Sequence, residues 1–158
     1  MSNGSLTKEE ILPTTPAFVA SRDGADFLVP VDYDQSRTEE HYDHHFYCYL
    51  TPGALDRFQI TGRGRSVVRM RLKSIERVFD HHEAAAGLLP GERFPDRAET
   101  EAFFRSFPEE KKRDIVSFSK SSFVESSFIT CVHTDHGELQ IRMYSSARWT
   151  DQYLVVVE

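Results

Sequence analysis

Hydrophobic and polar residues alternate along several stretches of the chain, which is the pattern of β-strands with one face in a core. Residues 57–72 contain two such runs around the sequence GRGR, which predicts a β-hairpin with a tight glycine turn. Aromatic and β-branched runs predict further strands, at 27–33, 45–50, 126–134, 138–145 and 152–158. The pattern therefore predicts a largely antiparallel β-sheet.

The middle third of the chain follows a helical period instead. Ile75, Phe79 and His82 fall at the spacing of one helix face, and Asp96 with Glu99 has the spacing of a capping box that opens a second helix. The spacing of Ile115 and Phe118 predicts a third helix. We therefore expect a helical insertion, over about residues 74–121, packed on one face of the sheet.

Together these elements predict an α+β fold in which the sheet is either open or a partly closed barrel. A chain of 158 residues suits one core, so we expect a flexible N-terminal tail over residues 1–16 and a single α+β domain over 17–158. No apolar stretch approaches the roughly 20 residues of a membrane span, and the start of the chain does not have the pattern of a signal peptide. We expect a cytoplasmic protein, without membrane contact, in which Cys48 and Cys131 are free thiols.

Charge is distributed unevenly along the chain. The net charge is −6, yet residues 57–77 contain seven basic side chains and one acidic one. On the predicted basic hairpin, residues 57–77, these cations would form a surface for a partner, and the candidate binding residues are Arg63, Arg65, Arg69, Arg71 and Lys73. Such a surface fits either a protein partner or the phosphates of a nucleic acid or phosphorylated ligand.

The histidines form three groups in the sequence, which raises the question of a metal site. Zinc or iron needs three or four convergent ligands, and the candidates are His41, His45, His81, His133 and His136. The chain has no HExxH string and no paired CxxC motif. A lone histidine on an apolar helix face or in a turn more often has a structural role, so a site with zinc, iron or another divalent transition metal is the alternative. The expectation is that the protein has no cofactor.

Catalytic strings are also absent: GRGR has neither the spacing nor the context of a phosphate-binding loop, and no catalytic residue is assigned. The sequence thus favours a non-enzymatic interaction protein, of inhibitor or adaptor type, that binds a protein partner through charge-segregated sheet surfaces. Two alternatives stay open: a histidine-dependent metal-binding hydrolase, and an anion or nucleic-acid binder that uses the basic hairpin.

Overall fold

The structure is a computed structural model, and it describes residues 18–20, 26–38, 46–77, 87–119, 129–144 and 153–158. The predicted tail, residues 1–16, lies outside this part of the chain. The described strands are β1 (Phe18–Ala20), β2 (Asp26–Asp32), β3 (Tyr49–Leu50), β4 (Arg65–Ile75), β5 (Ile115–Phe118), β6 (Ile129–Asp135), β7 (Glu138–Tyr144) and β8 (Tyr153–Val157). The helices are α2 (Tyr33–Thr38), α4 (Ala54–Arg57), α6 (Arg97–Ser106) and the 3₁₀ helix η2 (Pro108–Lys112).

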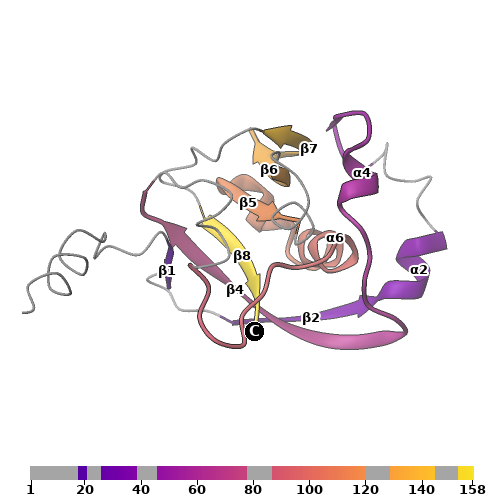
Figure 1. Ribbon diagram of the computed structural model, residues 1–158, viewed down its shortest axis with the longest axis horizontal. Helices are drawn as coiled ribbons and strands as arrows, with labels where there is room; N and C mark the ends of the chain where they lie inside the picture. Colours follow the sequence, from indigo (N-terminus) through magenta and orange to yellow (C-terminus); the bar gives the residue numbers. More distant parts are fainter. Residues whose placement is uncertain (1–17, 21–25, 39–45, 78–86, 120–128, 145–152) are drawn as a thin grey trace, which may run out of the picture.

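The eight described strands form one hydrogen-bonded sheet in the order β1-β4-β8-β5-β6-β7-β3, with β2 also paired to β4. Most neighbours are antiparallel, while β5–β8 and β3–β7 are parallel. The order runs from one edge to the other, so the described strands make an open sheet and not a barrel. The predicted α+β class with a largely antiparallel sheet is confirmed, and Figure 1 shows α6 lying over the sheet.

Helix α6 begins where the sequence predicts. The Asp96 carboxylate accepts a hydrogen bond from the Glu99 amide, and the Glu99 carboxylate accepts one from the Asp96 amide, so the capping box is formed. Phe103 and Phe104 are fully buried, and the Phe103 ring meets Phe27 of β2 edge to face at 5.1 Å between centroids. The aromatic side of α6 therefore fixes the helix against the inner face of β2.

The prediction of one helical insertion over residues 74–121 is wrong at both ends. Residues 74 and 75 extend β4, and Ile115–Phe118 is a strand whose four residues are all buried. A central strand covered on both faces has no polar alternation, so its spacing of apolar residues also matches a helix. The helix expected after Ile75 falls largely on residues 78–86, outside the described residues.

The predicted hairpin over residues 57–77 is also wrong. Phe58 follows α4 as its C-cap, and β4 pairs with β2 and β8 instead of with residues 58–60. The amides of Thr61 and Gly62 donate to Asp96 Oδ2 at 3.0 and 3.1 Å, so the segment before β4 binds the start of α6. By contrast, the turn between β6 and β7 is confirmed: His136 and Gly137 have φ of 51° and 82°, as a two-residue type I′ turn requires.

Candidate docking surface on the β2–β4 ribbon

Strands β2 and β4 form a two-stranded ribbon along one margin of the protein (Figure 1). Alternate side chains face the core, where Val29, Val31 and Met70 are almost completely buried. The other alternate positions face outward. We call these the outer ribbon face, and its residues are Asp26, Leu28, Pro30, Asp32, Arg65, Val67, Arg69 and Arg71.

The centre of the outer ribbon face is apolar. Leu28 is 58% exposed and Val67 is 65% exposed, which makes them two of the three large hydrophobic residues that are exposed in the described part of the chain. Pro30, also exposed, is the register partner of Val67, and Leu28 is diagonal to Val67 across the two strands. Three apolar side chains thus meet in one solvent-facing patch.

Charged pairs border this patch at both ends. At one end Arg65 Nε lies 3.0 Å from Asp32 Oδ2, and these two residues are register partners. At the other end Asp26 lies 3.2 Å from Arg71, and Arg71 also contacts Glu158 at 2.9 Å. A hydrogen bond from the Gln35 amide, together with Arg65, lowers the pKa of Asp32 below its usual value. The rim is therefore ionic, and its charges are largely matched.

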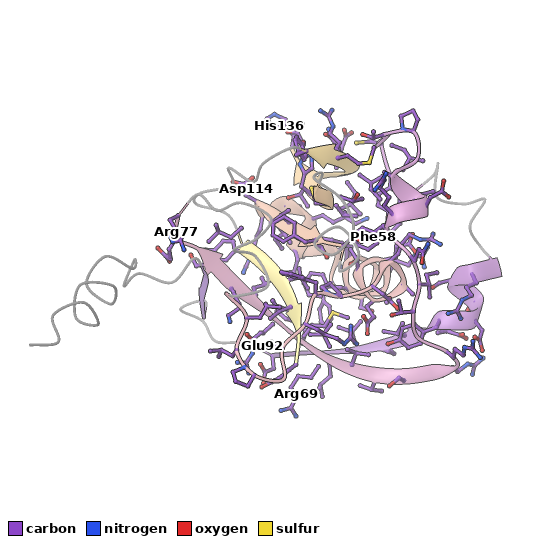
Figure 2. The ribbon with its side chains drawn as sticks, viewed as in Figure 1. Phe58, Arg69, Arg77, Glu92, Asp114 and His136 are labelled. Atoms are coloured by element: carbon purple, nitrogen blue, oxygen red, sulfur yellow. The ribbon has the colours of Figure 1, made fainter. Side chains whose placement is uncertain are left out.

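The predicted binding cations divide into two sets. Arg63 and Arg65 are exposed, Arg69 projects from β4 into solvent (Figure 2), and Arg71 is partly covered by its acidic partners. Lys73 is buried instead: its Nζ lies 2.6 Å from Glu92 Oε1, and the two side chains are 4% and 3% exposed. The sequence pattern could not separate Lys73 from the arginines, because Glu92 lies far along the chain.

The predicted metal ligands are only partly described: His41, His45 and His81 lie outside the described residues. His133 Nε2 lies 3.0 Å from the Tyr144 hydroxyl oxygen, and burial and then Arg142 lower the pKa of His133. His136 lies in the exposed β6–β7 turn. Within the described residues, no three side chains of metal-ligating type come together. The metal site stays a prediction.

A polar network around Glu99 supports the start of α6. The sequence predicted the capping box of Asp96 and Glu99, but not the other members of the network, Arg93 and Tyr33. Arg93 donates to both oxygens of Glu99 at 2.7 and 2.6 Å, and the Tyr33 hydroxyl donates to Glu99 Oε2 at 2.7 Å. Burial acts to raise the pKa of Glu99, but the hydrogen bonds from Arg93, the Asp96 amide and Tyr33 outweigh it and lower that pKa. The bond from Tyr33 to Glu99 thus ties α2 to α6, and Arg93 holds the same carboxylate.

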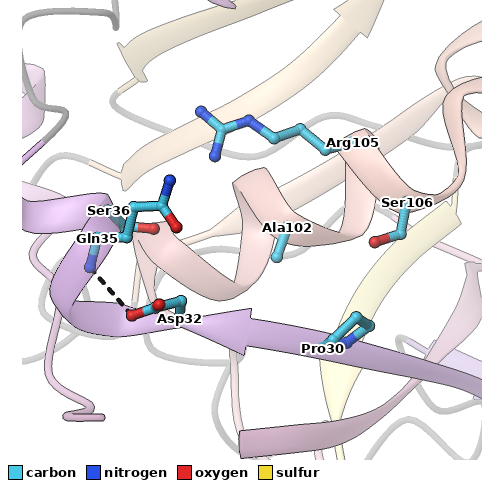
Figure 3. Close-up of a pocket in the computed structure, with 7 residues that line it drawn as sticks. All are labelled: Pro30, Asp32, Gln35, Ser36, Ala102, Arg105 and Ser106. Carbon is cyan, nitrogen blue, oxygen red and sulfur yellow. Dashed lines mark hydrogen bonds between the residues drawn. The ribbon is translucent and has the colours of Figure 1, made fainter. Parts of the chain in front are cut away.

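A groove of about 330 Å³ lies between β2 and α6 (Figure 3). Its lining residues are Pro30, Asp32, Gln35, Ser36, Ala102, Arg105 and Ser106. The Arg105 guanidinium lies 4.9 Å from the centre of the Phe46 ring, and Lys111 Nζ lies 4.8 Å from the same centre. The sequence contains no signal for this site, because its lining residues come from two segments, 30–36 and 102–106, that are far apart in the chain and of ordinary composition.

Among the described helices, none is long and apolar enough to cross a membrane. Comparison of the chain with protein-family models, with curated proteins and with solved structures found no match.

Proposed function

We propose that this protein is a small protein-binding module and that its partner docks on the outer ribbon face. The observation that carries the proposal is the exposed patch of Leu28, Pro30 and Val67 within a rim of ion pairs. Protein interfaces commonly combine an apolar centre, from which water is excluded, with a polar rim that sets orientation. The ribbon has both parts on one face.

The pairing of charges supports a protein partner over a polyanion. Asp26, Asp32 and Glu158 lie against the arginines of the outer ribbon face. A phosphate chain would have to compete with these carboxylates for the guanidinium groups, and it would gain nothing from the apolar centre. A protein surface with its own apolar side chain and mixed charges can use both features.

The test is capture of the partner after photo-crosslinking in an extract of the cells that make this protein. Leu28→Glu places a charge in the patch, while Leu89→Glu makes the same change at a residue that is equally exposed, at 58%, outside the ribbon. We expect Leu28→Glu to lower recovery of the identified partner by at least about tenfold, since central apolar contacts dominate interface energies. Leu89→Glu should leave recovery unchanged.

Equal recovery by both variants would contradict the proposal. Sedimentation velocity of the purified protein tests whether a second copy of this chain occupies the outer ribbon face. A dimer that Leu28→Glu abolishes and Leu89→Glu keeps would assign the outer ribbon face to a second copy of this chain, and the proposal of a different partner would then be wrong.

A further inference from the structure

The outer edge of β2 directs main-chain hydrogen-bonding groups away from the sheet. The Tyr33 amide donates to Gly64 O at 2.9 Å, so the odd-numbered residues of β2 and its extension bond to β4. The N–H and C=O groups of the even-numbered residues of β2 therefore point outward, away from β4. Pro30, which has no N–H, is one of these even-numbered residues. The Arg69 carbonyl, on the register partner of Leu28, accordingly points away from β2 and accepts from the Glu158 amide at 3.0 Å.

The outward set includes the N–H and C=O groups of Leu28, the C=O of Pro30 and the N–H of Asp32, whereas the C=O of Asp32 lies at the start of α2 and accepts the first hydrogen bond of that helix. Within the described strands, β2 pairs with β4 alone, so no described strand covers this edge. Alternate residues of a strand are about 7 Å apart, which is the spacing that an added strand matches. The edge therefore offers a short template for strand addition.

The groove lies along this same edge. Its strand wall consists of Pro30 and Asp32, both members of the outward set, and its other wall is α6. In Figure 3, Ala102 and Ser106 face from α6 into the space beside β2. A volume of about 330 Å³ is at the lower end of the range for ligand pockets, so the groove can receive side chains of an added strand.

Arg105 is the one cation among the residues that line the groove. Among the described residues, no carboxylate lies within ion-pair distance of Arg105 or Lys111, although both cations contact the Phe46 ring. Burial and then the charge of Arg105 lower the pKa of Lys111, because the two cations beside the Phe46 ring repel each other. Asp32, the one acid of the groove, is already bound by Arg65. An incoming carboxylate would relieve the repulsion.

We infer that an extended segment of the partner adds to the free edge of β2 as a strand, and that an acidic side chain of this segment enters the groove and binds Arg105. The inference deepens the proposed function, on which it rests, because it names the part of the partner that docks beside the outer ribbon face. The ligand class is an extended peptide with a carboxylate side chain.

The experiment uses two pools of nine-residue peptides with blocked ends. One pool has glutamate at the centre and the other has glutamine, and the remaining positions carry mixtures of Val, Thr, Ser and Leu. The immobilised full-length chain is incubated with each pool, and retained peptide is measured by mass spectrometry. We expect about fivefold more retention of the glutamate pool, as one exposed charge pair supplies.

Arg105→Gln should abolish this preference, while Lys112→Gln, which makes the same change on a side chain that is 74% exposed beyond the groove, should keep it. Leu28→Pro removes one outward N–H and leaves the bonds to β4 intact, whereas Leu28→Ala shortens the side chain and keeps the N–H. Leu28→Pro should retain about fivefold less peptide than Leu28→Ala, because one main-chain hydrogen bond is lost.

No retention of either pool, equal retention of both, or an unchanged preference in Arg105→Gln would overturn the inference. The Arg105 variant keeps the test decisive if Leu28→Pro fails to fold. The two proposals also fail separately. If Leu28→Glu loses the partner but no peptide is retained, the docking proposal stands and the strand-addition inference fails. If peptide is retained but Leu28→Glu keeps the partner, the groove binds peptide and the docking proposal fails.

Discussion

The outer ribbon face and the buried side of α6 are both rich in charged residues, yet the two regions use charge in opposite ways. On α6 the charges are enclosed, and the Glu99 side chain has no exposed surface and four hydrogen-bond donors around it. On the ribbon the arginines meet one or two carboxylates at the surface, and Arg65 is 86% exposed. Burial, more than the number of charges, therefore separates residues that hold the fold from residues that remain available to a partner.

The largest effect is expected when Glu99, the enclosed charge on α6, is removed. Glu99→Ala leaves the Arg93 guanidinium and the Tyr33 hydroxyl without their acceptor, so we expect the free energy of unfolding to fall by about 4 kcal/mol. Urea denaturation measures this loss. Glu109→Ala is the control, since that side chain is 81% exposed, and its midpoint should not move. Similar midpoints for the two variants would mean that enclosure does not matter.

A second variant tests the row of cations on β4 itself. Lys73→Ala leaves the Glu92 carboxylate buried without its cation, and we expect a loss of about 3 kcal/mol, measured by urea denaturation. Arg69→Ala, four residues earlier on the same strand, should leave stability unchanged because Arg69 is 57% exposed. In the double variant Lys73→Met/Glu92→Leu, apolar packing should restore most of the loss. If the Lys73→Ala protein is as stable as the Arg69→Ala protein, Lys73 contributes no more to stability than an exposed cation does, and the prediction is wrong.

Gly62 lies where the two regions meet. A Cβ at this position would overlap the ring of Tyr33, which is buried and held by Glu99. We expect Gly62→Ala to lower the free energy of unfolding by about 2 kcal/mol through overpacking, as measured by thermal unfolding. Gln59→Ala, at an exposed site of the same segment, is the control. An unchanged midpoint would show that Tyr33 can move aside without cost.

The smallest expected effect is a dependence of stability on pH. The folded-state pKa of Glu99 is lowered from its ordinary 4.5, so its contribution is present above that pH and is lost as the pH falls through the folded-state pKa. Burial and then Glu99 raise the pKa of Asp96, which acts in the opposite direction and reduces the net loss. Urea midpoints between about pH 6 and 3 should therefore fall less steeply in Glu99→Gln than in the original protein. Identical slopes would contradict the role given to Glu99.

Local sequence patterns predicted the elements whose cause is local. The capping box at Asp96 and the turn at His136 are set by a few adjacent residues, and the structure confirms both. The partner of β4 could not be read from the sequence, because β2 and β8 are each far from it along the chain. For the same reason, alternation placed Lys73 beside Arg71 without revealing that Glu92 encloses it.

The candidate site was predictable only in part. The alternating arginines indicated a charged sheet face, and the structure places Arg65, Arg69 and Arg71 on one. The apolar centre depends on register, since Leu28 and Val67 become neighbours only when β2 and β4 pair. The contact of Arg105 with Phe46 joins a helix to a distant segment, and no spacing rule reports such a contact.

Pro30 has a consequence for how copies of this protein meet each other. An exposed edge with apolar neighbours invites the same edge of a second molecule, and repeated pairing of this kind builds fibrils. At Pro30 the ladder would lack a donor, and an antiparallel approach centred on Val29 would set Asp26 of one molecule opposite Asp32 of the other. The edge thus resists stacking of identical chains while it stays open to a foreign strand, which separates recognition from aggregation.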